Sequence, residues 1–335
     1  MIGIDPTSSF WMGSEVIGVD WGGTRIRAGL VRFSKGNHEI LSLVDRRWDR
    51  SGYEDRDLHF LAALLEESFP SDLPVGLALA AMLDSRSGRL WNAPNLGWDI
   101  PAEGQDFGAL AHRILRRPVA VLNDVSAATF AEFHLGVGGR LGHLLGVFLG
   151  TGLGAGFVAD GRLLEGARGV ALELGHLMVQ PGGRLCGCGR RGCLEAYVGG
   201  RHLLERLHRD AEPGGALRES LVWSLAGGRL EALHPGLVDQ ACGHGDDYAC
   251  RFWDEVSDYL GTALAHVVTL LDPGMVVLGG SVFLGCPNLV ARSIEAAKKR
   301  ANAPALVDLE FVVSRLGDHA GMLGAALGAT EARVR

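Results

Sequence analysis

Apolar positions along the chain recur with two spacings, one typical of strands and one typical of helices. Buried-strand patterns, which are apolar and β-branched without a helical period, cover PVGLALAAML at 74–83, PVAVLND at 118–124 and MVVLGG at 275–280. Helical patterns cover residues 58–69, the segment SAATFAEFHLG after residue 125, residues 246–271 and residues 320–332. Because strands and helices alternate, the sequence predicts α/β layers with mostly buried sheets.

Two segments of the chain resemble each other. Residues 16–31, VIGVDWGGTRIRAGLV, and residues 144–158, LLGVFLGTGLGAGFV, each contain an apolar strand, a glycine-threonine turn and a second apolar strand. The pair Asp160–Gly161 predicts another hairpin turn. The repeat therefore predicts two similarly folded halves. A dinucleotide-binding fingerprint is the alternative for the second turn, but that motif opens a helix, whereas residues 155–159 have a strand pattern.

The composition excludes several classes of protein. The chain has 335 residues, 47% of them apolar, which favours a large core and two domains. Its 32 Lys and Arg residues are dispersed and outnumbered by 39 Asp and Glu residues, so at a net charge of −7 no nucleic-acid partner is expected. No apolar run reaches the roughly 18–20 residues that span a bilayer, so no membrane partner is expected. Residues 1–13 lack the features of a signal peptide and are predicted to be a loose extension.

The six cysteines do not form a disulfide framework in a chain of this length, and they favour a reducing, cytoplasmic setting. Cys242, Cys250 and Cys286 are scattered, and each is expected to be a small buried apolar residue. The other three lie in ELGHLMVQPGGRLCGCGRRGCLE, residues 173–195, together with a histidine and two carboxylates. This segment is a candidate metal site, redox site or pocket wall.

The glycine turns are candidate phosphate-binding loops, because backbone N–H groups approach an anion closely where no Cβ intervenes. The first turn follows Asp20, a carboxylate expected near Mg²⁺, and a later turn closes LDPGMVVLGGS at 271–281. The residues expected to contact the phosphates of a nucleotide and its Mg²⁺ are Asp20, Gly22, Gly23, Thr24, Thr151, Gly152, Gly154, Gly279 and Gly280. Two ordinary hairpins are the alternative explanation of the paired turns.

The motifs DWGGTRIRAGLV, LND at 122–124, LGTGLGAG, ELGH, CGCGRRGCLE and LDPGMVVLGGS occur in the order found in the ROK family. From Val16 to its C-terminus the chain resembles that family, which groups sugar kinases and related repressors within the actin-like ATPase superfamily. The resemblance implies an α/β, two-lobed actin-like ATPase fold of the ribonuclease H-like type, with a cleft between the lobes. It also implies ATP and a hexose or amino-hexose as substrates, with Mg²⁺ and a structural Zn²⁺.

The cysteine segment suits the implied zinc site. Three thiolates and a ring nitrogen fit a closed tetrahedral Zn²⁺ site with Zn–S distances of about 2.3 Å. The ligands expected are His176, Cys186, Cys188 and Cys193. The spacing does not match the C-x-x-C of a thioredoxin-like redox centre, and a reduced, metal-free thiol cluster is the alternative. Because no ligand position is left for water, the metal is expected to organise the loops that carry Glu173 and Glu195.

The resemblance further implies that Glu173, His176 and Glu195 hold sugar hydroxyls. Carboxylates suit this role because each can accept two hydrogen bonds from a polyol, and a metal-bound His176 keeps its other ring nitrogen for a hydroxyl or a carboxylate. The alternative for Glu195 is a carboxylate that faces a helix N-terminus. Asn95, in the polar loop NAPNLGWD, resembles a further sugar contact.

Asp124 matches the general base of the family. Phosphoryl transfer to an alcohol needs positioning, charge neutralisation and a base near the attacking hydroxyl, and Asp124 follows Asn123 at the end of a predicted strand. Asn123 is expected to hold the neighbouring hydroxyl and orient the sugar. The alternative is that Asp124 only caps the following helix, as Asn and Asp often do.

Three positions depart from the family pattern. Ala80-Ala81 stand where Pro-Gly is usual, Leu172 stands at the glycine of the usual Ala-Gly-Glu, and Arg25 replaces a frequent lysine with the charge kept. The first two departures flank the expected sugar pocket and therefore bear on the identity of the substrate.

Together these features predict a cytoplasmic, glucokinase-like kinase that transfers phosphate from ATP to the 6-hydroxyl of a hexose or amino-hexose. The predicted smaller lobe is 14–122 with 319–335, and the larger lobe is 123–318. A sugar-responsive regulator is one alternative, disfavoured because about fifteen residues before the first glycine strand are too few for a helix-turn-helix module; a sugar-binding protein without catalysis is another. The helical pattern at 246–271 suits a homodimer or homotetramer contact and a buried core face equally.

Overall fold

The computed structural model describes residues 14–34, 37–137 and 142–332. The chain divides into two compact units, the first made of Met1–Gly146, Gly156–Leu172 and Asp318–Arg335, the second of Val147–Ala155 and Glu173–Gly317. The first unit extends past the predicted boundary at residue 122, because α3 (Asp124–Ala131) packs against α11 (Ala320–Ala332). The extension predicted for residues 1–13 and the last three residues assigned to the smaller lobe lie outside the described residues.

The first unit is built on a five-stranded sheet with the order β3-β2-β1-β4-β8. Its strands are β1 (Glu15–Trp21), β2 (Arg25–Ser34), β3 (Asn37–Arg47), β4 (Val75–Leu79) and β8 (Val119–Asn123). The first three are antiparallel neighbours, whereas β1, β4 and β8 run parallel to one another. All five residues of β4 are buried, as expected for a parallel strand covered on both faces.

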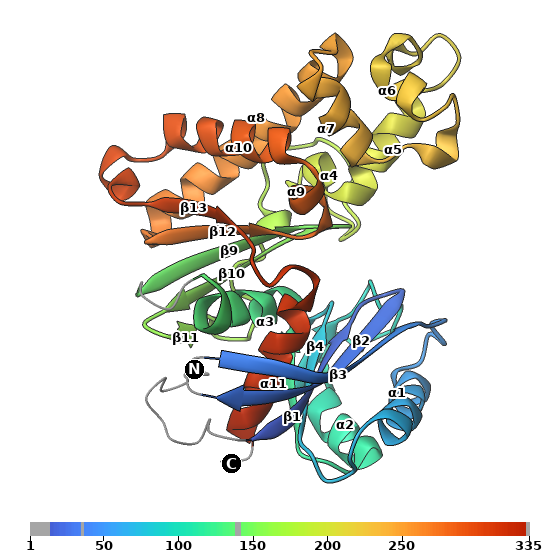
Figure 1. Cartoon of the computed structure of the whole chain (residues 1–335), viewed down its shortest axis with the longest axis vertical. Helices are drawn as coiled ribbons and strands as arrows, with labels where there is room; N and C mark the ends of the chain where they lie inside the picture. The colour runs from blue at the N-terminus through green and yellow to red at the C-terminus, as the bar shows by residue number, and fades with distance from the viewer. Residues whose placement is uncertain (1–13, 35–36, 138–141, 333–335) are drawn as a thin grey trace. The chain divides into compact units, whose positions relative to one another are not determined.

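Glycines bring α11 into close contact with one face of this sheet (Figure 1). A Cβ built on Gly76 of β4 would lie 1.8 Å from the Ala325 carbonyl oxygen, and one on Gly18 of β1 would lie 2.1 Å from that of Met322. Any larger side chain at these two positions would push the helix away from the strands. The close packing of α11 on the sheet therefore depends on the glycines of β1 and β4 as well as on the small residues of the helix itself.

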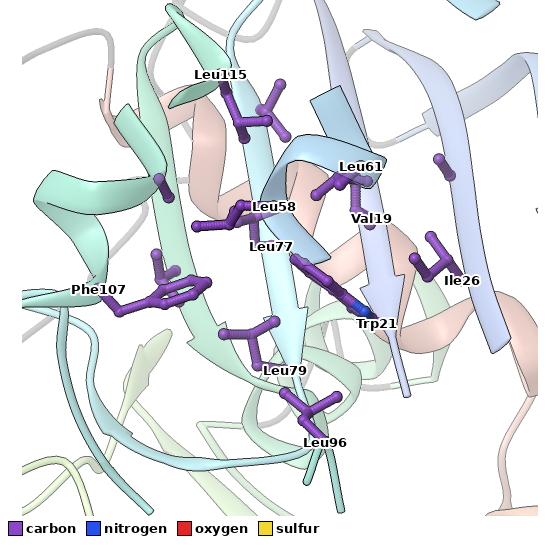
Figure 2. Close-up of a cluster of buried hydrophobic side chains, with 14 of the residues drawn as sticks. Val19, Trp21, Ile26, Leu58, Leu61, Leu77, Leu79, Leu96, Phe107 and Leu115 are labelled. Carbon is purple, nitrogen blue, oxygen red and sulfur yellow. The ribbon is translucent and has the colours of Figure 1, made fainter. Parts of the chain in front are cut away.

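The opposite face of the sheet carries the hydrophobic core of the first unit (Figure 2). Val19 and Trp21 alternate with Gly18 along β1, so they point away from α11 and into this core. They pack with side chains from α1 (Glu54–Ser68) and α2 (Phe107–Leu115). The labelled members in the close-up are Val19, Trp21, Ile26, Leu58, Leu61, Leu77, Leu79, Leu96, Phe107 and Leu115.

The second five-stranded sheet repeats the strand order of the first. Its order is β11-β10-β9-β12-β13, so a central strand is flanked by its two hairpin partners on one side and two later strands on the other, as in the first sheet. The strands are β9 (His143–Leu149), β10 (Leu153–Ala159), β11 (Arg162–Leu163), β12 (Met275–Gly279) and β13 (Glu310–Val313). The repeat predicted from the two glycine motifs is thus present in the topology, and Asp160–Gly161 forms the turn between β10 and β11.

Helices supply most of the second unit. The longest, α8 (Asp247–Leu271), packs along α10 (Pro287–Arg300), and both lie on one side of the second sheet in Figure 1. The remaining α-helices of this unit are α4 (Glu195–Val198), α5 (Gly200–Asp210), α6 (Leu221–Leu225), α7 (Pro235–Gly243) and α9 (Ser281–Gly285). The short 3-10 helices of the unit are η3 (Leu174–His176), η4 (Ala216–Glu219), η5 (Leu230–Ala232) and η6 (Ala303–Leu306).

Shorter elements complete the first unit. A small sheet has the order β5-β6-β7, formed by β5 (Met82–Asp84), β6 (Arg89–Asn92) and β7 (Gln105–Asp106). A π-helix, η2 (Glu132–Gly136), continues α3, and a 3-10 turn, η7 (Gly317–His319), precedes α11. Among the described residues, no helix is both long and apolar enough to cross a membrane.

One strand predicted from the sequence is wrong in extent. The apolar run at 74–83 forms two strands, β4 and β5, because the chain bends at Ala80-Ala81. There the N–H of Ala81 donates to the carbonyl of Leu79 at 2.7 Å instead of continuing a ladder. The apolar pattern could not reveal this bend, since all the residues around it are apolar.

Candidate active-site residues and metal cluster

The polar residues of the first unit stand at one edge of its sheet. In the parallel part of the sheet, Trp21 is in register with Leu79, and Leu79 with Asn123. Asp20, the bend at Ala80-Ala81 and Asp124 consequently lie within one or two residues of the same edge. This is the edge formed by the carboxyl ends of parallel strands, where ligands bind in open α/β sheets.

Asn123 and Asp124 form a small hydrogen-bonded group at the start of α3. The Asn123 Oδ1 accepts from the Ser126 N–H at 2.9 Å and so caps the helix. Its Nδ2 donates to the Ala81 carbonyl and to Asp124 Oδ1, each at 3.1 Å. The capping role considered for Asp124 therefore belongs to Asn123, and Asp124 is the first residue of the helix. Asn123 is engaged with protein atoms, and it holds the carboxylate of Asp124 in place.

Asp20 is a carboxylate placed in a desolvated position. Burial raises its pKa to about 6, against the opposing charge of Arg27. It lies close to the first turn of α11, since a Cβ built on Gly321 would be 3.0 Å from Asp20 Oδ2. A bound cation would stabilise the charged form of such a group. The residue thus fits the Mg²⁺ role expected from the sequence.

The first glycine turn is closed by a hydrogen bond of 3.0 Å from the Gly22 N–H to the Arg25 carbonyl. Gly23 is required by a close approach, because a Cβ there would lie 2.2 Å from the carbonyl oxygen of Asn95. That carbonyl also accepts from Arg50 Nη1 at 3.0 Å. Asn95, which was expected as a sugar contact from a separate loop, thus lies against the glycine turn. Asn95 and Thr24 are both exposed.

The second glycine turn lies against the carboxylate of Glu195. The Gly150 N–H donates to the Gly152 carbonyl at 3.0 Å, and the Leu153 N–H donates to Glu195 Oε2 at 3.0 Å. A Cβ on Gly152 would lie 2.4 Å from the same oxygen. Thr151 is exposed at the tip of the turn. After the turn the chain enters β10, a strand that contains Gly154, which rules out the helix of a dinucleotide fingerprint.

The third glycine turn, at Gly279–Gly280, lies beside the second. Gly280 has φ +85°, and a Cβ there would lie 2.5 Å from the Leu149 carbonyl oxygen at the end of β9. Gly150 is near Ser281 Oγ, at 3.8 Å from an added Cβ, and its carbonyl accepts from the Gly200 N–H at 2.9 Å. Two of the three predicted phosphate-binding turns are thus neighbours within the second unit.

Glu173 and Glu195 interact electrostatically. Desolvation raises the pKa of Glu173, and the charge of Glu195 raises it further, although Glu173 as a whole stays exposed. Glu173 precedes the short helix η3, whose last residue is His176, and Glu195 is the first residue of α4. The two carboxylates stand at the starts of two short helices, one before and one after the cysteines, so their spacing depends on the chain between them.

The cysteine segment brings together all four predicted metal ligands. One ligand atom from each of His176, Cys186, Cys188 and Cys193 lies within 4.8 Å of the other three. The Sγ atoms of Cys188 and Cys193 are 3.7 Å apart, as are Cys186 Sγ and His176 Nδ1. Ligands at about 2.3 Å from a tetrahedral centre are separated by about 3.8 Å. The measured spacings therefore fit a tetrahedral metal ion.

The backbone of the segment folds tightly around this cluster. The Cys186 N–H donates to the Arg190 carbonyl at 2.8 Å, and the Gly189 N–H donates to the Cys186 carbonyl at 2.9 Å. Burial raises the pKa of Cys186 to about 12; at Cys188 burial is outweighed by hydrogen bonds from Arg190, which lower the pKa to about 7. A divalent ion would compensate the charge of several thiolates at once.

Sequence reasoning missed several contacts at these sites. The Ala81 carbonyl that holds Asn123 is a backbone group, which no pattern of side chains signals. Leu172, next to Glu173, has φ +63°, a left-handed conformation that favours glycine. Nothing about a leucine side chain predicts this conformation. Cys250, expected to be an isolated buried residue, is half-exposed and touches Cys242, with the two Sγ atoms 3.2 Å apart.

The chain is similar to known sugar kinases over nearly its whole length. The ROK family model matches residues 16–332. The chain is 34% identical to the glucokinase of Thermotoga maritima over 316 residues, which cover 93% of this chain and 96% of that protein. It is 30% identical to the glucokinase of Streptomyces coelicolor, with 92% and 96% of the two chains covered.

Solved structures give the same result. A ROK family glucokinase from Streptomyces griseus in complex with glucose and AMPPNP matches with a TM-score of 0.80 at 28% identity, over 95% of this chain and 100% of that one. A ROK hexokinase from Thermus thermophilus matches with a TM-score of 0.72 at 33% identity, over 96% and 100%. These similarities confirm the α/β, actin-like ATPase fold expected from the sequence.

Proposed function

Since this chain belongs to the ROK family, we propose that it is an ATP-dependent kinase that phosphorylates the 6-hydroxyl of a hexose, with Asp124 as the general base. The observation that carries the proposal is the match to glucokinases over more than nine-tenths of the chain. ATP-dependent hexose phosphorylation follows from this similarity. The residue roles rest in addition on the geometry of each unit.

Asp124 is suited to accept the proton of the attacking hydroxyl. As the sugar oxygen bonds to the γ-phosphorus of ATP, the bond to the β–γ bridging oxygen breaks, and the hydroxyl proton passes to the Asp124 carboxylate. A positioned base contributes about 10²–10⁴-fold to such a step. The hydrogen bond from Asn123 fixes the carboxylate that receives the proton. We assign Asn123 to the orientation of the base and of the neighbouring hydroxyl.

The glycine turns and Asp20 are assigned to ATP. Backbone N–H groups at Gly23, Gly152 and Gly280 are donors of the kind that contact phosphate oxygens, whereas the Gly22 N–H closes its turn by donating to the Arg25 carbonyl. Thr24 and Thr151 add exposed hydroxyls. Asp20, with a pKa of about 6 in the absence of a cation, fits the Mg²⁺ that accompanies ATP. Mg²⁺, when bound, neutralises charge on the transferring phosphates.

Glu173, His176 and Glu195 are assigned to the sugar hydroxyls, with Asn95 as a further contact. Glu195 is restrained by the Leu153 N–H, which leaves its remaining lone pairs for hydroxyl donors. A sugar that lacks a hydroxyl paired with such a carboxylate loses that hydrogen bond, so these contacts discriminate between sugars. The stereochemistry of the hydroxyls that these residues accept from would set the preferred hexose.

A structural Zn²⁺ is assigned to His176, Cys186, Cys188 and Cys193, because their spacing and donor types suit it. The cluster sits between Glu173 and Glu195 in the sequence, and Cys186 Sγ is 3.9 Å from Glu195 Oε1. A metal held there would fix the chain on which both carboxylates depend. The kinase is assigned to the cytoplasm, where ATP is available.

A coupled ADP-release assay over a panel of hexoses tests the proposal. The panel contains glucose, mannose, allose, N-acetylglucosamine, N-acetylmannosamine and 6-deoxyglucose. We expect sugar-dependent ADP release with glucose and none with 6-deoxyglucose, which lacks the accepting hydroxyl. ADP release that is equal with and without every sugar would refute the kinase; phosphate found on another hydroxyl of glucose would refute the assigned position.

A further inference from the structure

Two cysteines outside the metal cluster are in contact at the junction of α7 and α8. Cys242 lies in the last turn of α7 and Cys250 in the first turn of α8, with their Sγ atoms 3.2 Å apart. Cys250 Sγ also lies 3.6 Å from the Cys242 carbonyl oxygen. Neither cysteine belongs to the residues assigned to ATP, sugar or zinc.

The loop between the helices fixes this contact. The Gly245 N–H donates to the Cys242 carbonyl at 2.9 Å, and Gly245 adopts φ +80°, which reverses the chain. Asp246 then caps α8 by accepting from the Ala249 N–H at 2.9 Å. Both ends of the loop are therefore held by hydrogen bonds, so the proximity of the two thiols is a property of the helix junction.

The two thiols differ in exposure and in partners. Cys250 is half-exposed, whereas Cys242 is buried at 7% exposure and accepts a contact of 3.5 Å from Arg292 Nη2. Arg292, on α10, is also paired with Asp254 of α8. An oxidant in solution thus meets Cys250 first, and the neighbour that can react with the oxidised sulfur lies beneath it, next to a guanidinium group that favours its thiolate.

We propose that Cys242 and Cys250 form a reversible oxidation site, at which a hydroperoxide converts the two thiols into an intramolecular disulfide. The Cys250 sulfur attacks one peroxide oxygen, which gives a sulfenic acid and water when hydrogen peroxide is the oxidant. The Cys242 sulfur then attacks Cys250 Sγ, the S–O bond breaks, and the second water leaves. The two thiols together lose two electrons and two protons, and the peroxide takes up both.

Closing the bond requires little movement. A disulfide S–S bond is about 2.05 Å long, so the sulfurs must approach by about 1.1 Å from their separation of 3.2 Å. At this separation the two side chains already point toward each other across the junction of α7 and α8. Reducing agents would reverse the bond, as expected for disulfides formed transiently in reducing compartments.

Cys286 is the matched control within the same unit. It is buried at 1% exposure, and burial and the charge of Asp239 raise the pKa of its thiol to about 12. Among the described residues, no other thiol is recorded in contact with it. It therefore has neither the access nor the partner that the pair Cys242 and Cys250 has.

The test is peptide mapping after a brief exposure of the purified protein to hydrogen peroxide, with free thiols blocked by N-ethylmaleimide. We expect a linked peptide that joins Cys242 to Cys250 and that dithiothreitol releases. Cys242→Ser and Cys250→Ser should each abolish it, and Cys286→Ser should leave it at the level of the unchanged protein. The proposal is overturned if both thiols stay fully blocked by maleimide while other cysteines oxidise, or if Cys250 links mainly to a cysteine of the metal cluster.

Trapping the sulfenic acid with dimedone tests the order of the two steps. The groups that face Cys242 are Cys250 of α8 and Arg292 of α10, the latter paired with Asp254. Burial raises the pKa of Cys242 to about 11 despite Arg292, so its thiolate fraction should grow roughly tenfold per pH unit below that value. We expect the Cys250 dimedone adduct to dominate at pH 6 and the disulfide at pH 9. A dimedone adduct found on Cys242 instead would reverse the assigned order.

Discussion

The two units hold their acidic side chains in different ways. In the first unit, Asp20 and Asp124 stand at the carboxyl edge of the parallel part of a mixed sheet, where strand register places them. In the second unit, Glu173 and Glu195 stand at the starts of two short helices, η3 and α4, on either side in sequence of three cysteines and a histidine that cluster together. The two sheets share one strand order, so the difference arises in the segments added to that common plan.

This difference indicates how each unit can position its acidic side chains precisely. A sheet edge positions side chains through backbone hydrogen bonds that the whole core supports, so a single helix cap by Asn123 completes the arrangement. The segment of 23 residues from Glu173 to Glu195 is supported instead by short local contacts, such as the isolated bridges between Met178 and Cys193 and between Leu185 and Arg191. The metal ion proposed for this segment would add a cross-link to these contacts, since ordering a loop of this kind by local hydrogen bonds alone is costly in conformational entropy.

The largest effect is expected at the sheet edge of the first unit. Asp124→Asn keeps the shape of the side chain but removes the proton acceptor, so kcat should fall by about 10²–10⁴-fold. KM for the sugar should change little, because the side chain keeps its shape. The zinc content should also change little, because the four predicted metal ligands all lie in the second unit. Steady-state kinetics and metal analysis check both expectations. A variant that retains more than about a tenth of the rate would contradict the assignment of the base.

A smaller effect is expected when the cross-link of the second unit is broken. Cys188→Ser removes an exposed ligand, so the loss of metal binding is not confounded by a buried cavity. Zinc per chain should drop, and KM for the sugar should rise by about 10–100-fold as Glu173 and Glu195 lose their support. Cys250→Ser is the matched control, because it removes a half-exposed thiol of the same unit outside the cluster. Unchanged zinc content in Cys188→Ser would show that the ligand set is wrong.

The sequence predicts the regular elements better than their connections. The helix predicted at 246–271 is α8, because its apolar period is long and Pro273 follows its end. The helix predicted from residue 58 begins at Glu54, since the first turn is polar and carries no apolar period. Within that turn Asp57 is buried and accepts from Trp98 Nε1 at 2.7 Å, a contact across 41 residues that no local pattern contains.

The site is predictable to the extent that its residues lie within short motifs. The metal ligands span Cys186 to Cys193 with His176 ten residues before, and the structure brings them together. The contacts of Asn95 with Gly23 and of Glu195 with Gly152 join distant segments through backbone or carboxylate oxygens. Such contacts depend on how the elements pack, and packing is not encoded in any one segment.

The sheet edge of the first unit can be tested further through Asp20, whose effect on the free energy of unfolding should depend on pH and reach a few kcal/mol. The pKa of Asp20 is about 6 in the folded protein, against an ordinary value of 3.8. From pH 3.8 to 6 the unfolded chain releases this proton first, so the contribution of Asp20 to the free energy of unfolding falls as pH rises. Above pH 6 the loss of stability caused by the buried, charged Asp20 carboxylate is complete, on the order of 2–3 kcal/mol.

Asp20→Asn should therefore stabilise the protein by about 2 kcal/mol at pH 7 and have little effect near pH 3.5. Its kcat should fall, because the Mg²⁺ ligand is lost, so stability and activity move in opposite directions. Denaturant unfolding at the two pH values measures the first effect. Asp45→Asn is the control: Asp45 is paired with Arg25 and Arg27, at 2.5 Å and 3.1 Å, and its replacement should not stabilise. Equal stabilisation by both variants would mean that desolvation of Asp20 is not the cause.

The smallest effect is expected at Leu172, immediately before Glu173. Leu172 adopts φ +63°, a left-handed conformation that costs a residue with a Cβ roughly 1–2 kcal/mol. At ordinary positions glycine is less stable than alanine by about 0.5–1 kcal/mol, because its unfolded chain has more freedom. At position 172 the order should reverse, so Leu172→Gly should be more stable than Leu172→Ala by about 0.5 kcal/mol.

The neighbouring residue supplies the reference for this comparison. Ala171 is not among the described residues with positive φ, so Ala171→Gly should cost the ordinary 0.5–1 kcal/mol, roughly. Denaturant midpoints of the three variants give the two glycine–alanine differences, which should have opposite signs. The same sign at both positions would show that Leu172 carries no strain. If the signs differ and Leu172→Gly also raises KM for the sugar, the strained leucine contributes to the placement of Glu173, and backbone conformation positions this carboxylate in addition to any effect of the proposed metal.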